Sequence, residues 1–419
     1  MSLWLYSLLW WLGLPLVLGR LWWRGRKEPG YRRHWRERLG FYGARPAPRH
    51  TLWVHAVSVG ETRAAEPLVE ALLQAYPDSR IVLTCMTPTG RATGQALFGK
   101  HGARVLQAYL PYDTQAMVRR FLRHFEPRIC ILMETEVWPN LIAACHGRVP
   151  VALVNARLSE RSLRRGQKVG RLMTDAARAV PLVAAQTEDD AARIRSLGAP
   201  NVAVTGSIKF DVVVPQAMLD LGAWLRERIG ARSVLLCAST REGEEALLLE
   251  AYLTAALPKD TLLMVVPRHP QRFGEVAQLF EARGLSVQRR SQLAGAVTSR
   301  VLIGDSMGEM FAYYAACDVA FIGGSLLPLG GQNLIEACAL GKPVLIGPHT
   351  FNFAQVSEEA IRAGAALCVQ DAPHLFADAA RLLEDHDSRA AMGQGGVAFS
   401  SHHRGATART VGLVRPLIR

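Results

Sequence analysis

The chain is built from short, uninterrupted apolar runs that alternate with amphipathic stretches. A strand that is covered by helices on both faces reads as a continuous apolar run, so this alternation predicts parallel sheets of the α/β class. After Glu61, Ala65, Leu68, Val69 and Leu72 follow the i, i+3, i+4, i+7 spacing of a helix with one buried face. The expected strands are Leu52–Val57, Ile81–Met86, Ile129–Met133, Val151–Val154, Leu182–Ala185, Val202–Thr205, Val234–Ala238, Leu262–Val266, Val301–Ile303, Val319–Ile322 and Val344–Ile346.

The strand rhythm breaks near residues 211–230, which predicts two domains of this kind. A length of 419 residues with 49% hydrophobic residues suits two or three domains with sizeable cores. We expect a membrane anchor at 1–23, a Rossmann-like domain at 24–211, a linker at 212–230 and a second Rossmann-like domain at 231–419. Ligands of such sheets bind at the carboxyl ends of the strands, so two facing domains would hold a donor and an acceptor across one cleft.

The amino-terminal segment predicts membrane attachment. Residues 3–19 carry no charge, and six of the nine tryptophans, which favour the membrane interface, lie in the first 35 residues. The basic residues that follow are Arg20, Arg24, Arg26, Lys27, Arg32, Arg33, Arg36 and Arg38. They place the body of the chain in the cytoplasm and argue against a cleaved signal peptide, whose positive charge would precede the apolar run. Seventeen uncharged residues with Pro15 among them leave a spanning and an in-plane helix both open.

The overall charge limits the classes of binding partner, and the cysteines indicate the cellular compartment. A net charge of +13 would suit a nucleic-acid binder, but the sequence has no zinc-finger spacing, basic zipper or aromatic RNA-binding motif. Anionic lipid, phosphate-bearing substrates and nucleotides explain the same charge, and we expect no nucleic-acid partner. The 7 cysteines are scattered without a C-x-x-C pair, which predicts reduced, buried thiols in a cytoplasmic compartment.

Three acidic or basic groups follow strands of the first half. Glu61 would lie in the first turn of a helix, either as a structural acid that complements the helix dipole or as a general base that the dipole keeps ionised. Glu134 and Glu136 follow the strand at 129–133, where one carboxylate would orient substrate or stabilise developing positive charge, or would simply cap a helix. Lys209 would hold a departing phosphate or be an ordinary exposed lysine.

The second half has phosphate-binding features at its own strand ends. Arg268 directly follows a strand and can hold phosphate oxygens with two parallel hydrogen bonds, unless it lies in a solvated loop. The segments 304–310, 323–325 and 330–336 are glycine-containing turns, which let a backbone approach a ligand closely or serve a purely structural turn. Glu336 would accept hydrogen bonds from ribose hydroxyls. No lysine-serine or lysine-threonine follows the glycines, so this is not a P-loop.

One acidic motif near the carboxyl terminus has the pattern of a metal site. Asp385-His386-Asp387 matches the D-x-D pattern of metal-dependent glycosyltransferases, but it lies in a charged stretch and not at a strand end. We interpret it as a solvated loop and predict no metal site.

Eleven motifs in order resemble the bacterial Kdo (3-deoxy-D-manno-octulosonic acid) transferases. They are HAVSVGE, MTPTG, PYD, METEVWPN, NARLS, TGSIKFD, ASTREGEE, VPRHPQR, GDSMGEM, GGQNLIE and GPHTFNF, which run from residue 55 to residue 353. The resemblance implies an inverting glycosyltransferase of the GT-B type, with two facing Rossmann-like domains, that needs no metal or other cofactor. It implies transfer of Kdo from CMP-Kdo to the lipid A precursor (lipid IVA) in lipopolysaccharide biosynthesis, on the cytoplasmic side of the inner membrane.

The resemblance also implies roles for single residues. By position, Glu61 matches the general base, and Glu134 and Lys209 match the transition-state stabilisers. The positions that match CMP contacts are Arg268, His269, Met307, Gly308, Glu309, Asn333, Leu334, Ile335 and Glu336. Arg241 departs from the family pattern, in which we expect histidine, so donor affinity would differ if this position contacts the donor.

Two other classes of protein stay open as alternatives: a sugar-nucleotide 2-epimerase, and an anchored nucleotide- or lipid-binding module. The membrane anchor argues against the epimerase, because an epimerase would act on a soluble substrate.

Overall fold

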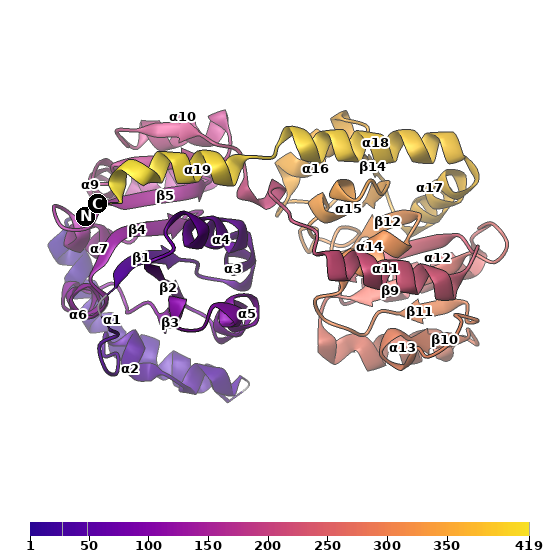
Figure 1. Ribbon diagram of the computed structural model, residues 1–419, viewed down its shortest axis with the longest axis horizontal. Helices are drawn as coiled ribbons and strands as arrows, with labels where there is room; N and C mark the ends of the chain where they lie inside the picture. The colour runs from indigo at the N-terminus through magenta and orange to yellow at the C-terminus, as the bar shows by residue number, and fades with distance from the viewer. Residues whose placement is uncertain (27, 48, 419) are drawn as a thin grey trace. The chain divides into compact units, whose positions relative to one another are not determined.

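The computed structural model describes residues 1–26, 28–47 and 49–418 and groups them into two compact domains (Figure 1). The N-terminal domain comprises Met1–Asp211 together with Arg404–Arg419, and the C-terminal domain comprises Val212–His403. Lys27, one of the basic residues that follow the apolar segment, lies outside the described residues.

The N-terminal domain is a seven-stranded parallel sheet in the order β3-β2-β1-β4-β5-β6-β7. Its strands are β1 His50–His55, β2 Ser79–Cys85, β3 Val105–Tyr109, β4 Pro127–Met133, β5 Val151–Ala156, β6 Leu182–Ala185 and β7 Val202–Val204. Its helices are α1 Leu3–Arg24, η1 Pro29–Arg32, α2 Trp35–Arg38, α3 Val59–Ala64, α4 Glu66–Ala75, α5 Pro88–Phe98, η2 Gly99–Arg104, α6 Gln115–Phe125, α7 Pro139–Cys145, α8 Glu160–Val169, α9 Arg171–Arg178, α10 Glu188–Ser196, η3 Ile208–Phe210, α19 Ala406–Val414 and η6 Arg415–Leu417.

Helices cover both faces of this sheet, which explains why its strands are continuous apolar runs. Side chains alternate between the faces of a strand, and in β1 Leu52 and Val54 pack in one core cluster while Trp53 packs in the other. Leu68 of α4 lies in the first cluster and Phe121 of α6 in the second. The predicted buried face that follows Glu61 is confirmed, because Ala65, Leu68, Val69 and Leu72 are all buried.

The C-terminal domain repeats the plan with the order β10-β11-β9-β8-β12-β13-β14. Its strands are β8 Val234–Thr240, β9 Leu262–Pro267, β10 Val287–Arg289, β11 Val301–Ile303, β12 Val319–Ile322, β13 Val344–Ile346 and β14 Ala366–Cys368. Its helices are α11 Gln216–Ile229, α12 Glu244–Thr254, η4 Pro270–Arg272, α13 Phe273–Glu281, η5 Arg290–Gln292, α14 Met310–Ala316, α15 Ile335–Ala339, α16 Ala354–Arg362, α17 Ala372–Glu384 and α18 His386–His402.

All eleven expected strands are present, and the three that the pattern missed, β3, β10 and β14, are edge strands. An edge strand is less completely covered than a central one, so its residues need not form a continuous apolar run. Gln107 in β3 and all three residues of β10 are only partly buried. Their sequences therefore lacked the pattern on which the other strands were recognised.

The domain boundaries differ from the expected ones at two places. Residues 216–229, expected within a linker, form α11, which packs against α14 in the C-terminal domain. Residues 404–419, expected in the second domain, belong to the first (Figure 1, where α19 is yellow). The carboxylate of Asp211 accepts hydrogen bonds from the backbone N–H groups of Gly405 and Thr407 at the start of α19, and Ala406 and Val414 are fully buried in the core. This segment is held on the N-terminal sheet by its buried apolar side chains and by the hydrogen bonds that Asp211 accepts from the first backbone N–H groups of α19.

The segment α1 is one helix, with Pro15 inside it. It is long and apolar enough to cross a membrane, with 22 residues and a mean hydropathy of 1.3, which fits the predicted anchor without deciding how it meets the bilayer.

The cysteines are free, as predicted. Six are buried, but Cys368 in the edge strand β14 is exposed, which corrects the expectation that all of them are buried.

Candidate functional site

The strand order of the N-terminal domain brings two of the predicted site residues to one place. The chain runs from β1 outward to β2 and β3, and then returns to the other side of β1 as β4, so the order reverses between β1 and β4. Ligands of open parallel sheets bind outside the carboxyl ends of the strands at such a reversal. Glu61 follows the carboxyl end of β1, and Glu134 follows that of β4 directly.

Glu61 is half-buried in the first turn of α3, where it forms a variant of the capping box in which its carboxylate accepts from Val57, the residue before the N-cap Ser58. The Ser58 side chain accepts a hydrogen bond from the backbone N–H of Glu61, with a distance of 3.4 Å. The Glu61 carboxylate accepts hydrogen bonds from the backbone N–H of Val57 at 2.8 Å and from the Ser58 hydroxyl at 3.1 Å. The first-turn position of Glu61 is as predicted, and these hydrogen bonds hold its carboxylate in one orientation.

The surroundings of Glu61 also bear on the functional reading. Burial, together with the neighbouring carboxylates of Glu136 and Glu134, raises the pKa of Glu61 to about 7, although the hydrogen bonds from Val57 and Ser58 lower it. Desolvation and like charge therefore oppose the ionisation that the helix dipole was expected to favour. A carboxylate with a pKa near neutrality is suited to accept a proton from a hydroxyl group.

Glu134 and Lys209 are brought into contact from segments far apart in the chain. The Lys209 Nζ atom lies 2.8 Å from one carboxylate oxygen of Glu134, and the Arg157 Nε atom lies 3.4 Å from the other. Glu134 is buried and adopts a left-handed backbone conformation with φ of 56°. Such a conformation costs free energy in a residue other than glycine and is found where the surroundings hold the residue in place, often at functional sites.

Asn155 positions this lysine and was missed by the sequence reasoning. It is the next-to-last residue of β5, where it has a left-handed conformation with φ of 50°, and its side chain is fully buried. Its Oδ1 atom accepts a hydrogen bond of 3.1 Å from the backbone N–H of Ile208, the residue before Lys209. The NARLS motif contains Asn155, but only the fold shows that its partner lies in TGSIKFD.

The C-terminal domain has its own reversal of strand order, between β8 and β12. The glycine-rich turn after β12 is held by Glu244, which is fully buried and was not predicted as a site residue. Its carboxylate accepts hydrogen bonds from the backbone N–H groups of Gly324 at 2.6 Å, Leu326 at 3.0 Å and Arg241 at 2.9 Å. Glu244 thereby ties the turn after β12 to the turn after β8.

Close backbone contacts explain the first glycine of that turn. A Cβ atom on Gly323 would lie 2.6 Å from the carbonyl oxygen of Ser239 and 2.7 Å from the Cα atom of Thr240. Both are backbone atoms at the end of β8, which cannot move aside cheaply. Only glycine allows the turn to lie this close to β8.

A group of cationic side chains lies at the ends of β8 and β9. The backbone N–H of Arg268 donates a 2.9 Å hydrogen bond to the carbonyl of Thr240, which joins the two strand ends. Burial lowers the pKa of His269, and the charges of Arg241, Arg268 and Arg272 lower it further, so all three arginines lie near this ring. Arg272 is also paired with the buried Glu245 at 3.0 Å. The group offers positive charge and a neutral imidazole to an anionic ligand.

The remaining predicted CMP positions lie in two turns of the same domain. Glu309 accepts a hydrogen bond of 2.6 Å from the Ser306 hydroxyl and forms an ion pair with Arg290 at 3.2 Å. Met307 is 52% exposed beside Gly308, which has a φ of 83°.

The second turn begins α15. The Asn333 side chain accepts a hydrogen bond from the backbone N–H of Ile335 and donates one to Glu336, which lies in the first turn of α15 as predicted. Leu334 and Ile335 are fully buried, and their side chains pack into the domain.

Asp385 is the N-cap of α18, since its carboxylate accepts a 2.9 Å hydrogen bond from the backbone N–H of Ser388. His386 and Asp387 are exposed, as expected, but they lie in the first turn of α18 and not in the predicted loop, because Asp385 caps a helix there. Within residues 1–26, 28–47 and 49–418, no group of three or more His, Cys, Asp or Glu side chains is arranged to hold a metal ion. Metal-independent chemistry stays a prediction.

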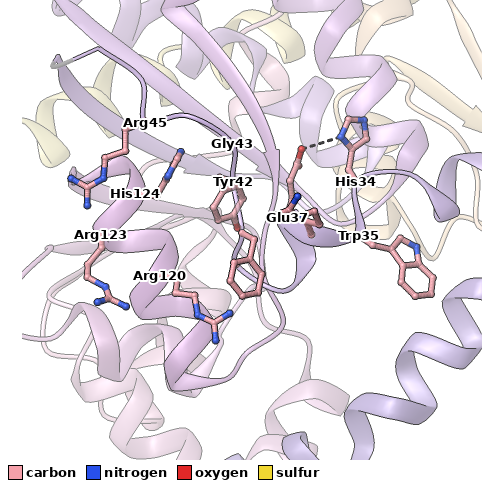
Figure 2. Close-up of a pocket in the computed structure, with 12 residues that line it drawn as sticks. His34, Trp35, Glu37, Tyr42, Gly43, Arg45, Arg120, Arg123 and His124 are labelled. Carbon is pink, nitrogen blue, oxygen red and sulfur yellow. Dashed lines mark ion pairs between the residues drawn. The ribbon is translucent and has the colours of Figure 1, made fainter.

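A basic pocket of about 750 Å³ lies elsewhere on the N-terminal domain (Figure 2). Arg45, Arg120 and Arg123 lie on one side of it, and His34 with Glu37, which are paired at 3.1 Å, lie on the other. Its lining includes neither Glu61 nor Glu134, so it is distinct from the site at the strand ends. Its charge suits an anionic group.

Known proteins are similar in sequence to this chain over most of its length. Residues 33–212 match a family described as 3-deoxy-D-manno-octulosonic-acid transferase (kdotransferase). A relative from Bordetella pertussis named 3-deoxy-D-manno-octulosonic acid transferase is 48% identical over 415 residues, which cover 95% of both chains. The chain belongs to the 3-deoxy-D-manno-octulosonic acid transferase family. A Haemophilus influenzae protein of the same name is 37% identical over 414 residues, or 96% of both chains.

A solved structure shares the fold. The UDP-GlcNAc 2-epimerase from Neisseria meningitidis, solved with UDP-GlcNAc, aligns with 88% of this chain and all of its own, with a TM-score of 0.58 and 16% identity. This likeness confirms two Rossmann-like domains of the GT-B type and says nothing about activity. Membership of the Kdo transferase family makes the chain a glycosyltransferase.

Proposed function

We propose that this glycosyltransferase moves Kdo from CMP-Kdo to the lipid A precursor lipid IVA, with inversion at the anomeric carbon, in lipopolysaccharide biosynthesis. The observation that carries the proposal is the carboxylate cluster at the strand reversal of the N-terminal domain. There Glu61, with its pKa raised to about 7, lies near the carboxylate of Glu134, which is paired with Lys209. The names of the relatives from Bordetella pertussis and Haemophilus influenzae support Kdo as the transferred sugar.

In the proposed reaction Glu61 accepts the proton of an acceptor hydroxyl. The hydroxyl oxygen forms a bond to the anomeric carbon of Kdo while the bond from that carbon to the CMP phosphate breaks, and CMP leaves with the electron pair. Attack from the face opposite the leaving group inverts the anomeric centre. Lys209, oriented by Glu134, offsets the charge that develops in the transition state.

The C-terminal domain supplies groups for the donor. Arg268 and its cationic neighbours suit the CMP phosphate, and the Glu244-held turn presents its backbone close to a ligand. Glu309, Asn333 and Glu336 supply polar groups for the nucleoside. These residues bind the donor without a metal ion in this proposal.

The acceptor is a lipid, which accounts for the amino-terminal features. The apolar α1 and its basic surroundings bring the enzyme to the cytoplasmic face of the inner membrane. The basic pocket in Figure 2 adds positive charge on the same domain for the phosphates of an anionic lipid.

The variant Glu61→Gln tests the proposal. Glutamine keeps an oxygen for the capping box but cannot accept the proton, so we expect transfer to fall by a factor of about 10² to 10⁴ with CMP binding retained. The full-length protein would be incubated with CMP-Kdo and lipid IVA, and the lipid product measured by mass spectrometry. Glu66→Gln, in the first turn of α4, is the matched control and should transfer normally.

The same assay can contradict the proposal in two ways. A lipid whose mass does not increase with the wild-type protein would rule out this transfer and favour a different reaction, such as epimerisation of a sugar nucleotide. Transfer by Glu61→Gln at the wild-type rate would rule out Glu61 as the base.

A further inference from the structure

The helix α1 is docked lengthwise on the N-terminal domain by one of its faces. Leu14 is buried in a cluster with Tyr112 and Met117, and Trp10, Val17 and Leu18 pack against the same cluster. The rings of Trp10 and Tyr112 lie 5.8 Å apart. Positions 10, 14, 17, 18 and 21 share one side of a helix with 3.6 residues per turn, and Leu21 is buried as well.

Two hydrogen bonds fix the amino-terminal half of this face. The Tyr6 hydroxyl donates to the Asp113 carboxylate at 2.9 Å, and the Ser7 hydroxyl donates to the Asn140 side chain at 2.9 Å. Asp113 is fully buried, and it also accepts hydrogen bonds from the backbone N–H groups of Asn140 and Leu141 at the start of α7. Asp113, the acid of the PYD motif, therefore joins α1 to the domain body.

The carboxyl-terminal end of α1 is docked too. The Arg32 Nε atom donates a 3.2 Å hydrogen bond to the carbonyl of Trp22, and its guanidinium lies 4.6 Å from that ring. The Arg24 guanidinium lies 4.4 Å from the ring of the buried Tyr31. Contacts thus run from the first to the last turns of a helix about 33 Å long.

If α1 crossed the bilayer, it would have to lose these contacts with the N-terminal domain. Tyr6 and Ser7 would move into hydrocarbon, and the buried Asp113 and Asn140 would each lose a hydrogen-bond donor. The loss of a hydrogen-bond partner from a buried polar group is unfavourable, and more so when the group is charged. The tryptophan and leucine side chains that form the domain-facing surface would also lose their packing.

The opposite face of α1 is exposed and apolar, with the character of a membrane-interface helix. Its exposed large side chains are Trp4, Leu5, Leu8, Leu9, Trp11, Leu12, Leu16, Trp22 and Trp23. Arg20, Arg24 and Arg26 are exposed at its carboxyl-terminal end. Tryptophan and leucine that enter the headgroup boundary, next to arginines that attract anionic lipid, are typical of helices lying in the membrane plane.

We propose that α1 lies in the plane of the membrane interface, between the N-terminal domain and the headgroups of an anionic bilayer, and does not cross it. Both ends of α1 are then on the same side of the membrane as the catalytic body. This inference rests on the membrane attachment proposed above but not on the transfer reaction, and its tests do not measure transfer.

A disulfide cross-link tests the docked position in native membranes. The side chains of Ser7 and Asn140 are in contact, so Ser7→Cys with Asn140→Cys should cross-link on mild oxidation, seen as a mobility shift reversed by reductant. The background carries Cys368→Ser to remove the exposed native thiol. Leu16→Cys with Asn140→Cys is the control, because Leu16 is 78% exposed on the other face and should not cross-link. Equal cross-linking of the two pairs, or none in either, would contradict docking.

Labelling from one side of the membrane tests the topology independently, without changing Asn140. In sealed inverted vesicles, whose outer face is the cytoplasmic one, a membrane-impermeant maleimide should label Ser2→Cys as readily as the native Cys368 on the body. A Ser2→Cys thiol that reacts only after the vesicles are opened, while Cys368 reacts at once, would show a spanning helix and overturn the inference.

Binding to vesicles tests the lipid as the occupant of the exposed face. The triple variant Trp11→Ser, Leu12→Ser and Leu16→Ser should lose at least about tenfold in affinity for vesicles that contain phosphatidylglycerol, whereas Val397→Ser on the C-terminal domain should not. Unchanged vesicle binding by the triple variant would contradict the inference. So would dimers of the wild-type protein that the triple variant abolishes without affecting vesicle binding, because a second copy would then be the occupant.

Discussion

At the scale of single residues, Glu61 serves two roles that make opposite demands on its charge. As the third residue of a capping box it is favoured when ionised, because it accepts hydrogen bonds from Val57 and Ser58. Burial and the nearby carboxylates of Glu136 and Glu134 oppose ionisation and raise its pKa to about 7. The balance leaves the carboxylate held in place yet able to exchange a proton near neutral pH.

This balance predicts the pH dependence of both activity and stability. For transfer, kcat/KM should rise about tenfold per pH unit below about pH 7 and level off above it, as the proposed base loses its proton. For folding, a raised folded-state pKa favours the protonated form, so stability is lost as pH rises from the unfolded value of 4.5 through about 7. Chemical unfolding should therefore show that the free energy of unfolding of Glu61→Gln increases relative to that of the wild type between about pH 4.5 and pH 8, by on the order of 2–3 kcal/mol.

The corresponding control is Glu66→Gln, which should keep the wild-type rate profile. A wild-type kcat/KM that is flat from pH 5.5 to pH 8 would show that proton transfer to Glu61 does not limit the reaction.

At the scale of elements, the glycine turn after β12 is shaped by a carboxylate from another helix. Glu244 lies in the first turn of α12 and accepts hydrogen bonds from the turn after β12 and from the turn after β8. These hydrogen bonds hold the turn in place through protein contacts alone. A preformed site binds its ligand without the entropic cost of ordering a loop.

Loss of this carboxylate should weaken nucleotide binding. In Glu244→Gln the amide NH₂ group would face backbone N–H donors that now meet an oxygen, leaving at least one of them unsatisfied at a cost of about 1–3 kcal/mol. Calorimetric titration should show the Kd of CMP raised about tenfold or more. Glu242→Gln, an exposed neighbour in the same segment, should bind CMP normally. Wild-type affinity in Glu244→Gln would show that the turn is held by other contacts.

At the scale of the whole molecule, the last helix of the chain stabilises the first domain. Ala406 and Val414 of α19 are fully buried among side chains of the N-terminal sheet and α4, and Asp211 caps the helix. The chain leaves this domain at Asp211 and returns to it at Arg404, so the C-terminal domain is an insertion between two parts of the first.

Truncation after His403 should therefore destabilise the distant N-terminal domain. Loss of the buried α19 side chains is expected to cost that domain more than about 3 kcal/mol, seen as an earlier thermal transition and stronger protease cleavage within residues 50–211. CMP binding by the C-terminal domain should be unchanged and serves as the internal control. Cleavage confined to residues 212–403 would contradict the assignment of α19.

Local patterns were enough to predict much of this protein. Continuous apolar runs predicted the central strands, because a strand such as β1 must be apolar on both faces wherever helices cover both. The same runs placed Glu61, Glu134 and Arg268 at strand ends, and the order of the motifs indicated the family. All of these depend on neighbours along the chain.

Other features depend on partners that are distant in the sequence, and only the tertiary structure decided them. The edge strands β3, β10 and β14, the contacts of Glu244 and Asn155, and the return of α19 belong to this group. So do the contacts of α1 with the N-terminal domain, on which the proposal of an in-plane helix rests, since a sequence of seventeen uncharged residues suits a spanning and an in-plane helix equally. A hydrogen bond such as that of Tyr6 to Asp113 joins residues 107 positions apart, and no local pattern of either segment specifies the other.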